Sequence, residues 1–243
     1  MRFSWRDELI EDHVEQMLKL WKEVYCKVYA APLKRIFKRS GIVDVDALVA
    51  CSVIMHDVGK LTRLYQQHLV ERLSLRGYRH EVLSSAITEI VFSRFPWSNY
   101  VSAAVLLSHE PILLGQVGRA GERYFSVTLA NRSLWLVADE NKRIRLEEDG
   151  VEALNKILKK EGFNVSLADE YSLSSCLDAL RKILVKTSLL GNRHFSRIRI
   201  ATLAHLLTLL DSLVASRNRR DDEGGTFVSK YARYAEVGEV WRR

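Results

Sequence analysis

Apolar residues recur every three or four positions along most of the chain, which predicts a mostly α-helical protein. Only three prolines and twelve glycines occur among the 243 residues, so few positions interrupt long helices and a β-sandwich is not expected. The pattern predicts helices over Asp7 to Tyr29, Ala31 to Ser40, Val45 to Met55, Leu61 to Leu75, residues 78–91, Trp97 to Glu110, Val151 to Lys160, Ser172 to Leu190 and about Arg197 to Arg217.

The pattern changes between Glu122 and Leu146. There Phe125, Val127 and Leu129 alternate with polar residues, and two polar turn signals follow. We therefore expect a small β-hairpin or meander inserted between helices, serving as a lid, a partner-docking edge or a plain insertion. The organisation predicted from the whole pattern is one helical domain over residues 1–217, with a polar tail or docking arm over residues 218–243.

Composition restricts the setting in which the protein works. With 37 Lys and Arg against 30 Asp and Glu, the net charge is +7, which favours a polyanionic partner. The cysteines Cys26, Cys51 and Cys176 are odd in number and lack C-x-x-C spacing, so neither a disulfide framework nor a structural zinc site is expected. The apolar run Ile200 to Ser216 is short for a bilayer and predicts a buried helix of a soluble protein. The first residues lack the apolar core of a signal peptide, so we expect a cytoplasmic location.

Six side chains of metal-binding type occupy inward-facing positions or helix ends in this pattern. A lone histidine is more often a core residue, and an aspartate after a helix can cap the next one. A bundle whose helices each turn an imidazole or a carboxylate toward one point is, however, a common way to build a metal site. Such a donor set suits manganese, iron, cobalt or nickel. The six residues are His13, His56, Asp57, His80, His109 and Asp211.

The order of these residues resembles the pattern of the HD-domain metal-dependent phosphohydrolase superfamily: a histidine, a His-Asp pair, further histidines and a distal aspartate. Four longer segments point to one group within this superfamily. They are H-D-V-G-K-L from His56 followed by Tyr65-Gln66, R-H-E-V-L-S-S-A from Arg79, S-H-E from Ser108 and L-D-S-L-V-A-S from Leu210. With them the chain resembles the stand-alone CRISPR-associated HD nuclease of type I interference systems. That resemblance implies an HD-domain helical bundle that degrades DNA.

The resemblance also implies roles for individual residues. His13, His56, Asp57 and Asp211 would bind a first metal ion, and Asp57 would bridge to a second ion held by His80 and His109. The family often has two adjacent histidines where this chain has His109-Glu110, so Glu110 is a further possible ligand. Asp57 and Lys60 would be catalytic, with Lys60 against the scissile phosphate. The resident metal would be Mn, Ni, Co, Fe or Mg, as one or two ions. A lysine on a helix surface is the alternative interpretation of Lys60.

The expected partners are single-stranded DNA, with RNA also considered, a separate helicase subunit and an RNA-guided CRISPR effector complex. The chain has no G-x-x-x-x-G-K-[ST] phosphate loop, so ATP-driven unwinding would come from another subunit. Two other functions stay open: an HD phosphohydrolase of small nucleotides, and an idle HD scaffold that docks a helicase. Candidate contacts to the DNA backbone, which otherwise are ordinary solvated surface, are Lys34, Arg35, Lys38, Arg39, Arg217, Arg219 and Arg220.

Overall fold

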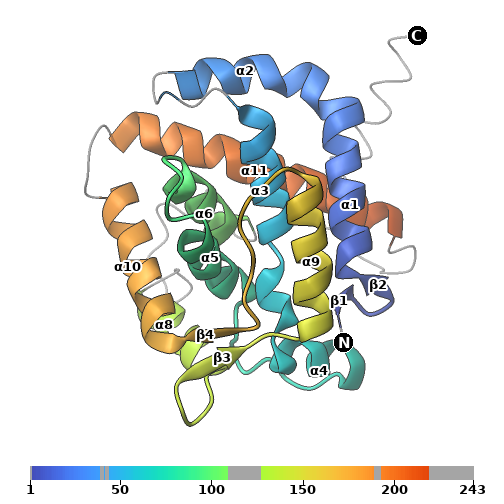
Figure 1. The fold of residues 1–243 in the computed structure, drawn as a ribbon, viewed down its shortest axis with the longest axis vertical. Helices are drawn as coiled ribbons and strands as arrows, with labels where there is room; N and C mark the ends of the chain where they lie inside the picture. The colour runs from blue at the N-terminus through green and yellow to red at the C-terminus, as the bar shows by residue number, and fades with distance from the viewer. Residues whose placement is uncertain (1, 39–40, 42–43, 109–126, 189–192, 219–243) are drawn as a thin grey trace, which may run out of the picture.

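The computed structural model describes residues 2–38, 41, 44–108, 127–188 and 193–218, and within them helices surround one central helix (Figure 1). The mostly α fold class predicted from the sequence is confirmed. The α-helices are α1 (Ile10–Leu20), α2 (Cys26–Lys38), α3 (Val45–Met55), α4 (Arg63–Glu71), α5 (His80–Val91), α6 (Ser98–Leu107), α8 (Val127–Trp135), α9 (Glu148–Lys160), α10 (Leu173–Ser188) and α11 (Arg193–Asn218). The strands are β1 (Phe3–Trp5), β2 (Glu8–Leu9), β3 (Arg143–Arg145) and β4 (Glu170–Ser172), in two antiparallel pairs.

Helix α3 is the inner element of the bundle. Residues from Leu48 to Met55 are all buried, because the helix packs against α1, α2, α5, α6, α9 and α11. Its first turn is closed by Asp44, whose side chain accepts a hydrogen bond of 2.9 Å from the backbone N–H of Ala47. A helix that is apolar on all sides is stable only inside a fold, so its C-terminal end delivers His56 to the interior.

The first long helical segment begins later than the sequence pattern predicts. Residues Phe3–Trp5 pair with Glu8–Leu9 as strands β1 and β2, and α1 begins only at Ile10. The segment continues through a π-helical turn, Trp21–Tyr25, directly into α2, where two separate helices were predicted. Because a two-stranded pair this short depends on what it packs against, its presence is not readable from local periodicity.

The predicted hairpin between Glu122 and Leu146 is wrong for the part that the structure describes up to Trp135. Val127–Trp135 is helix α8, in which Ala130 and Leu134 are buried on one face. In the second part of the interval, Ala138 and Ile144 form an antiparallel bridge, and strand β3 pairs with β4, with Ile144 opposite Tyr171. The apolar positions fit both periods over so short a stretch, and burial of the i, i+4 face selected the helix. Residues 122–126 lie outside the described residues, as does the predicted tail beyond residue 218.

Helix α11 accounts for the apolar run near the end of the chain. By length and composition alone, its span His194–Asn218 could cross a membrane, because it contains an 18-residue window with a mean hydropathy of 1.6. In the structure it packs against α1, α2, α3, α6 and α10, and Leu203, Leu206 and Leu210 are buried among them. The predicted buried helix is confirmed, and packing explains why this stretch is so apolar.

Candidate metal centre

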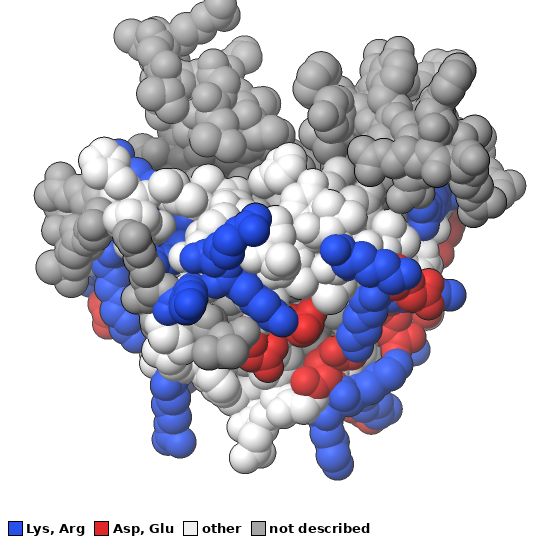
Figure 2. All heavy atoms as spheres, turned by 90° about the horizontal axis from the view of Figure 1, so that it is seen from above, with Lys and Arg blue, Asp and Glu red and all other residues white. Residues whose placement is uncertain are grey.

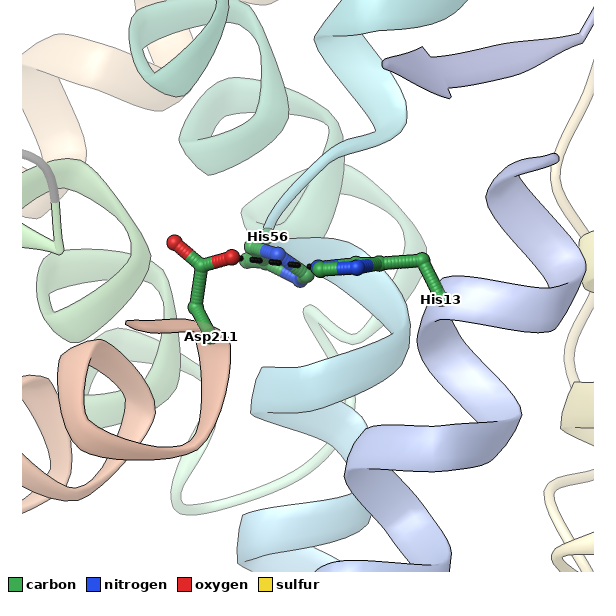
Figure 3. Close-up of side chains that lie close together, drawn as sticks. All are labelled: His13, His56 and Asp211. Carbon is green, nitrogen blue, oxygen red and sulfur yellow. Dashed lines mark hydrogen bonds and ion pairs between the residues drawn. The ribbon is translucent and has the colours of Figure 1, made fainter. Parts of the chain in front are cut away.

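Side chains from three separate helices meet in the interior below the end of α3. His13 extends from α1, His56 follows the last residue of α3, and Asp211 extends from α11 (Figure 3). One possible ligand atom from each residue lies within 4.8 Å of the others. His13 and His56 are fully buried, and the Asp211 side chain is 18% exposed. These three of the predicted metal ligands are therefore gathered at one point by the fold.

Hydrogen bonds direct one particular nitrogen of His13 toward this point. Its Nδ1 lies 3.0 Å from Oε1 of Glu8, and its Nε2 lies 3.1 Å from Oδ1 of Asp211. Burial alone would lower the pKa of His13, but the hydrogen bonds to Asp211 and Glu8 outweigh it and raise the pKa to about 9. A proton therefore sits between His13 and Asp211 when no cation is bound, and a metal ion would take its place.

His56 is held by the helix that it ends. Its Nδ1 donates to the carbonyl oxygen of Val53 at 2.7 Å, which leaves Nε2 as the atom that can accept a cation. Burial lowers the pKa of His56 to about 4, and the nearby carboxylates of Asp57 and Asp211 oppose this only in part. The ring is therefore neutral, as a metal ligand must be.

Asp57 lies beside His13, His56 and Asp211 and forms an ion pair with the buried Lys60. Its Oδ2 lies 2.7 Å from Nζ of Lys60, 3.0 Å from Oγ of Ser4 and 3.4 Å from Nε2 of His56. Burial would lower the pKa of Lys60, but the Asp57 carboxylate outweighs it and holds the pKa above its usual value. Lys60 is only 4% exposed, so its interpretation as a helix-surface lysine is wrong.

His80 reaches the other oxygen of Asp57. Its Nε2 lies 3.4 Å from Oδ1 of Asp57, and its Nδ1 lies 3.6 Å from Oε2 of Glu81. His80 thus stands next to the three-residue group through Asp57, and its role as a ligand to a second ion stays a prediction. His109 and Glu110, its predicted companions, lie outside the described residues.

A close backbone approach at Gly59 fixes the distance between the His56-Asp57 pair and His80. A Cβ atom at Gly59 would lie 2.1 Å from the carbonyl oxygen of His80, so only glycine fits. The Gly59 N–H donates to Oγ of Ser84 at 2.8 Å, and the Gly59 carbonyl accepts from Oη of Tyr78 at 2.7 Å. The turn after the His-Asp pair is therefore fastened to both sides of His80.

Ser4 and Glu8 contact the centre but were not found from the sequence. Both belong to the short N-terminal strands, and both are buried, with Ser4 at 0% and Glu8 at 9% exposure. The only sequence signal is that they precede the predicted buried face of α1. Nothing in the pattern pairs Ser4 with Asp57, 53 positions away, and a spacing of five residues does not place Glu8 beside His13 on a predicted helix.

The basic residues proposed to contact DNA are distributed between α2 and the end of α11. Lys34, Arg35 and Lys38 are exposed on α2 opposite buried Leu33 and Phe37, as the amphipathic pattern predicts. In the view from above, the Lys and Arg side chains of the described residues are interspersed with Asp and Glu (Figure 2). A continuous basic surface is absent from the described part of this face. Arg217 is exposed on α11, and Arg39, Arg219 and Arg220 lie outside the described residues.

The gathered groups fit a divalent cation. Each histidine is fastened through Nδ1, so that Nε2 is directed to the common point, and Asp211 supplies a carboxylate oxygen to the same point. Two imidazole nitrogens with carboxylate oxygens suit an intermediate transition metal better than a hard ion bound only by oxygens. A cation at this point would also neutralise the carboxylates that the fold draws out of water.

Comparison with known proteins places these observations in context. No protein-family model matches the chain. The chain is 30% identical over 246 residues to a CRISPR-associated endonuclease Cas3-HD of Thermoproteus tenax, covering 97% of both. It is 26% identical to proteins of the same name from Pyrococcus furiosus and Methanocaldococcus jannaschii, covering 92% and 98% of this chain and 94% of each relative. A solved Cas3 HD domain protein from Methanocaldococcus jannaschii superimposes with a TM-score of 0.65 and 22% identity, over 84% of this chain and 97% of that one.

Proposed function

The chain belongs to the family of CRISPR-associated Cas3-HD endonucleases, and we propose that it hydrolyses phosphodiester bonds of single-stranded DNA with the aid of a divalent metal ion. The observation that supports this proposal is the convergence of His13, His56 and Asp211 beside the buried pair Asp57 and Lys60. A fold that only docks a partner has no need of so many ligand-type groups in its interior, since burying them without a cation is costly.

The residues of the centre have two proposed roles: binding metal ions and stabilising negative charge on the phosphate. His13, His56, Asp57 and Asp211 would hold the first ion, and His80 would hold a second together with Asp57. Divalent cations supply hydroxide near neutral pH and neutralise charge that develops on a phosphate. Lys60 stays protonated beside Asp57 and adds a fixed positive charge in a buried environment, where it acts more strongly than at a solvated surface.

Among the described residues, the side of the centre formed by Asp211 and His80 is the more open one, and the substrate would approach from there. Among the residues of the centre, the Asp211 side chain is 18% exposed and that of His80 is 12% exposed, while His13, His56 and Asp57 are fully buried. A phosphodiester entering here meets His80 and Asp211 first. Because the CRISPR relatives are endonucleases by name, we propose a cytoplasmic role beside a separate helicase and an RNA-guided complex.

The test is cleavage of a labelled circular single-stranded DNA by metal-stripped protein, with Mn²⁺, Ni²⁺, Co²⁺, Fe²⁺ or Mg²⁺ added back. A circle has no ends, so its linearisation identifies an endonuclease. The variant Asp211→Asn should remove cleavage, whereas Asp178→Asn, which changes an exposed carboxylate on α10, should leave it unchanged. RNA and a panel of nucleotides are run in parallel. Hydrolysis of the nucleotides alone would overturn the proposal in favour of a small-molecule phosphohydrolase.

A further inference from the structure

The N-terminal strands β1 and β2 place two polar side chains against the centre. Phe3 pairs with Leu9 and Trp5 with Glu8 in an antiparallel register, so the chain turns back on itself before α1 begins. Ser4 is fully buried and Glu8 nearly so, although both are polar and sit in strands of two or three residues. Polar groups are buried at the start of a chain only where they find partners.

Ser4 finds its partner in Asp57. The Ser4 hydroxyl donates to Oδ2 of Asp57 at 3.0 Å, on the same oxygen that Lys60 contacts at 2.7 Å. Two donors on one oxygen fix the rotation of the carboxyl group. As a result Oδ1 is directed toward His80, from whose Nε2 it lies 3.4 Å.

Glu8 finds its partner in His13. Its Oε1 lies 3.0 Å from Nδ1 of His13, the nitrogen opposite to the one that faces Asp211. A carboxylate on the far nitrogen of a ligating histidine orients the ring and makes the near nitrogen a stronger donor to a metal. The same Glu8 oxygen accepts a hydrogen bond from Asn218 at the end of α11, the helix that carries Asp211.

A buried glutamine fastens β1 in this position. The Gln66 side chain accepts from the backbone N–H of Phe3 at 2.9 Å and donates to the Phe3 carbonyl at 2.9 Å, as a neighbouring strand would. It also donates to the carbonyl of Lys60 at 2.8 Å. The position of Ser4 is thereby tied to the same turn that carries Asp57 and Lys60.

From these contacts we propose that the β1–β2 hairpin is a built-in support of the metal centre, in which Ser4 and Glu8 are positioning residues for Asp57 and His13. The inference rests on the proposed metal-dependent nuclease. It adds that metal affinity depends on the first nine residues of the chain, which supply no ligand themselves. The alternative is that the hairpin only covers the core.

The experiment uses the full chain, stripped of metal, with Ser4→Ala and Glu8→Gln as separate variants. Mn²⁺ affinity is measured by calorimetry, and the visible absorption spectrum of Co²⁺-loaded protein reports ligand geometry. We expect each variant to bind Mn²⁺ about 10- to 100-fold more weakly and to alter the Co²⁺ spectrum. Cleavage should fall at low Mn²⁺ and recover at saturating Mn²⁺, since both side chains are buried and act through Asp57 and His13.

Two matched variants separate support of the metal from packing. Ser52→Ala removes a buried hydroxyl that bonds only to the Leu48 carbonyl within α3, and Asp7→Asn removes an exposed carboxylate from the turn between the strands. Both should bind Mn²⁺ as the unchanged protein does. If Ser4→Ala and Glu8→Gln also retain full affinity and spectrum, the hairpin has no supporting role and this inference fails alone. If the unchanged protein binds no divalent ion, the proposed function fails first.

Discussion

Asp57 and Glu89 are both withdrawn from water, with 0% and 1% exposure, yet the fold balances their charges differently. Glu89 on α5 lies 2.6 Å from Nζ of Lys182 and 3.7 Å from Nζ of Lys186, both of which extend from α10 into solvent. Ser102 adds a hydroxyl at 3.3 Å. Among the described residues, the partners of Glu89 are two ammonium groups and one hydroxyl, and none is an imidazole.

Asp57 has a different set of neighbours. Its oxygens lie 3.4 Å from Nε2 of His56 and 3.4 Å from Nε2 of His80, and the His13 and Asp211 pair is adjacent. A buried carboxylate beside a lysine is thus an ordinary structural feature, as Glu89 shows. What marks a functional centre is the convergence of several ligand-type atoms from separate helices on one point.

The largest expected effect comes from removing the carboxylate at that point. Asp57→Ala should abolish both Mn²⁺ binding and cleavage, because a bound cation supplies several kcal/mol of transition-state stabilisation, or at least about 10³-fold in rate. Calorimetry and the circular-DNA assay measure the two effects. Full activity in a folded Asp57→Ala protein would contradict the assignment of the centre.

Gly59→Ala tests whether cleavage depends on the close packing of the His56-Asp57 turn against His80. The new Cβ meets the His80 carbonyl at 2.1 Å, so we expect a loss of about 2 to 4 kcal/mol in the free energy of unfolding, together with loss of cleavage. Gly77→Ala is the control, since a Cβ there meets nothing within 4 Å and only its positive φ of 86° is penalised, by about 1 kcal/mol. Urea denaturation gives both values, and equal losses would refute the close-approach argument.

Lys60→Ala separates charge stabilisation from metal binding. We expect cleavage to slow by about 10²-fold while Mn²⁺ still binds, because Lys60 contributes a positive charge and no ligand atom. Lys22→Ala removes a lysine whose ion pair with Glu161 is at the surface and should not change the rate. Loss of Mn²⁺ binding in folded Lys60→Ala would show that Lys60 is needed to assemble the centre.

Glu89→Gln should have the smallest effect on function. The amide keeps the shape of the side chain but loses its charged hydrogen bonds, which costs about 1 to 2 kcal/mol of stability, discounted because Lys182 and Lys186 reach solvent. Calorimetric unfolding should show a melting temperature lower by a few degrees, with an unchanged cleavage rate. A tenfold fall in the rate would place Glu89 in the working centre and remove the contrast with Asp57.

Much of the fold was predictable from periodicity. The interval Val45 to Met55 was predicted as a helix and is α3, and the start of α5 near His80 was also predicted, because continuous apolar or amphipathic periods leave little choice. The β1–β2 pair and the helix α8 were not, because very short elements are decided by their tertiary neighbours.

The candidate site was predictable only where its residues lie on the strongly periodic helices. His13, His56 and Asp211 are predictable because each is a polar residue at an inward-facing position or helix end, and the fold gathers them. Ser4 and Glu8 could not be chosen, since a serine and a glutamate in a polar N-terminal stretch are ordinary until the strand is seen against Asp57 and His13. Metal binding by His13, His56 and Asp211 stays a prediction, as does its support by Ser4 and Glu8. The roles of His80, Lys60 and the basic residues are likewise predictions.

The proposed function depends on a divalent metal ion bound by His13, His56, Asp57 and Asp211. The most direct test is anomalous X-ray diffraction from crystals of the metal-stripped protein soaked in Mn²⁺. We expect an anomalous peak in contact with Nε2 of His13, Nε2 of His56 and a carboxylate oxygen of Asp211, with Asp57 alongside. A peak only at surface carboxylates would show that these residues do not bind the ion. The absence of a peak, while His13, His56 and Asp211 keep their hydrogen-bonded positions, would show the same.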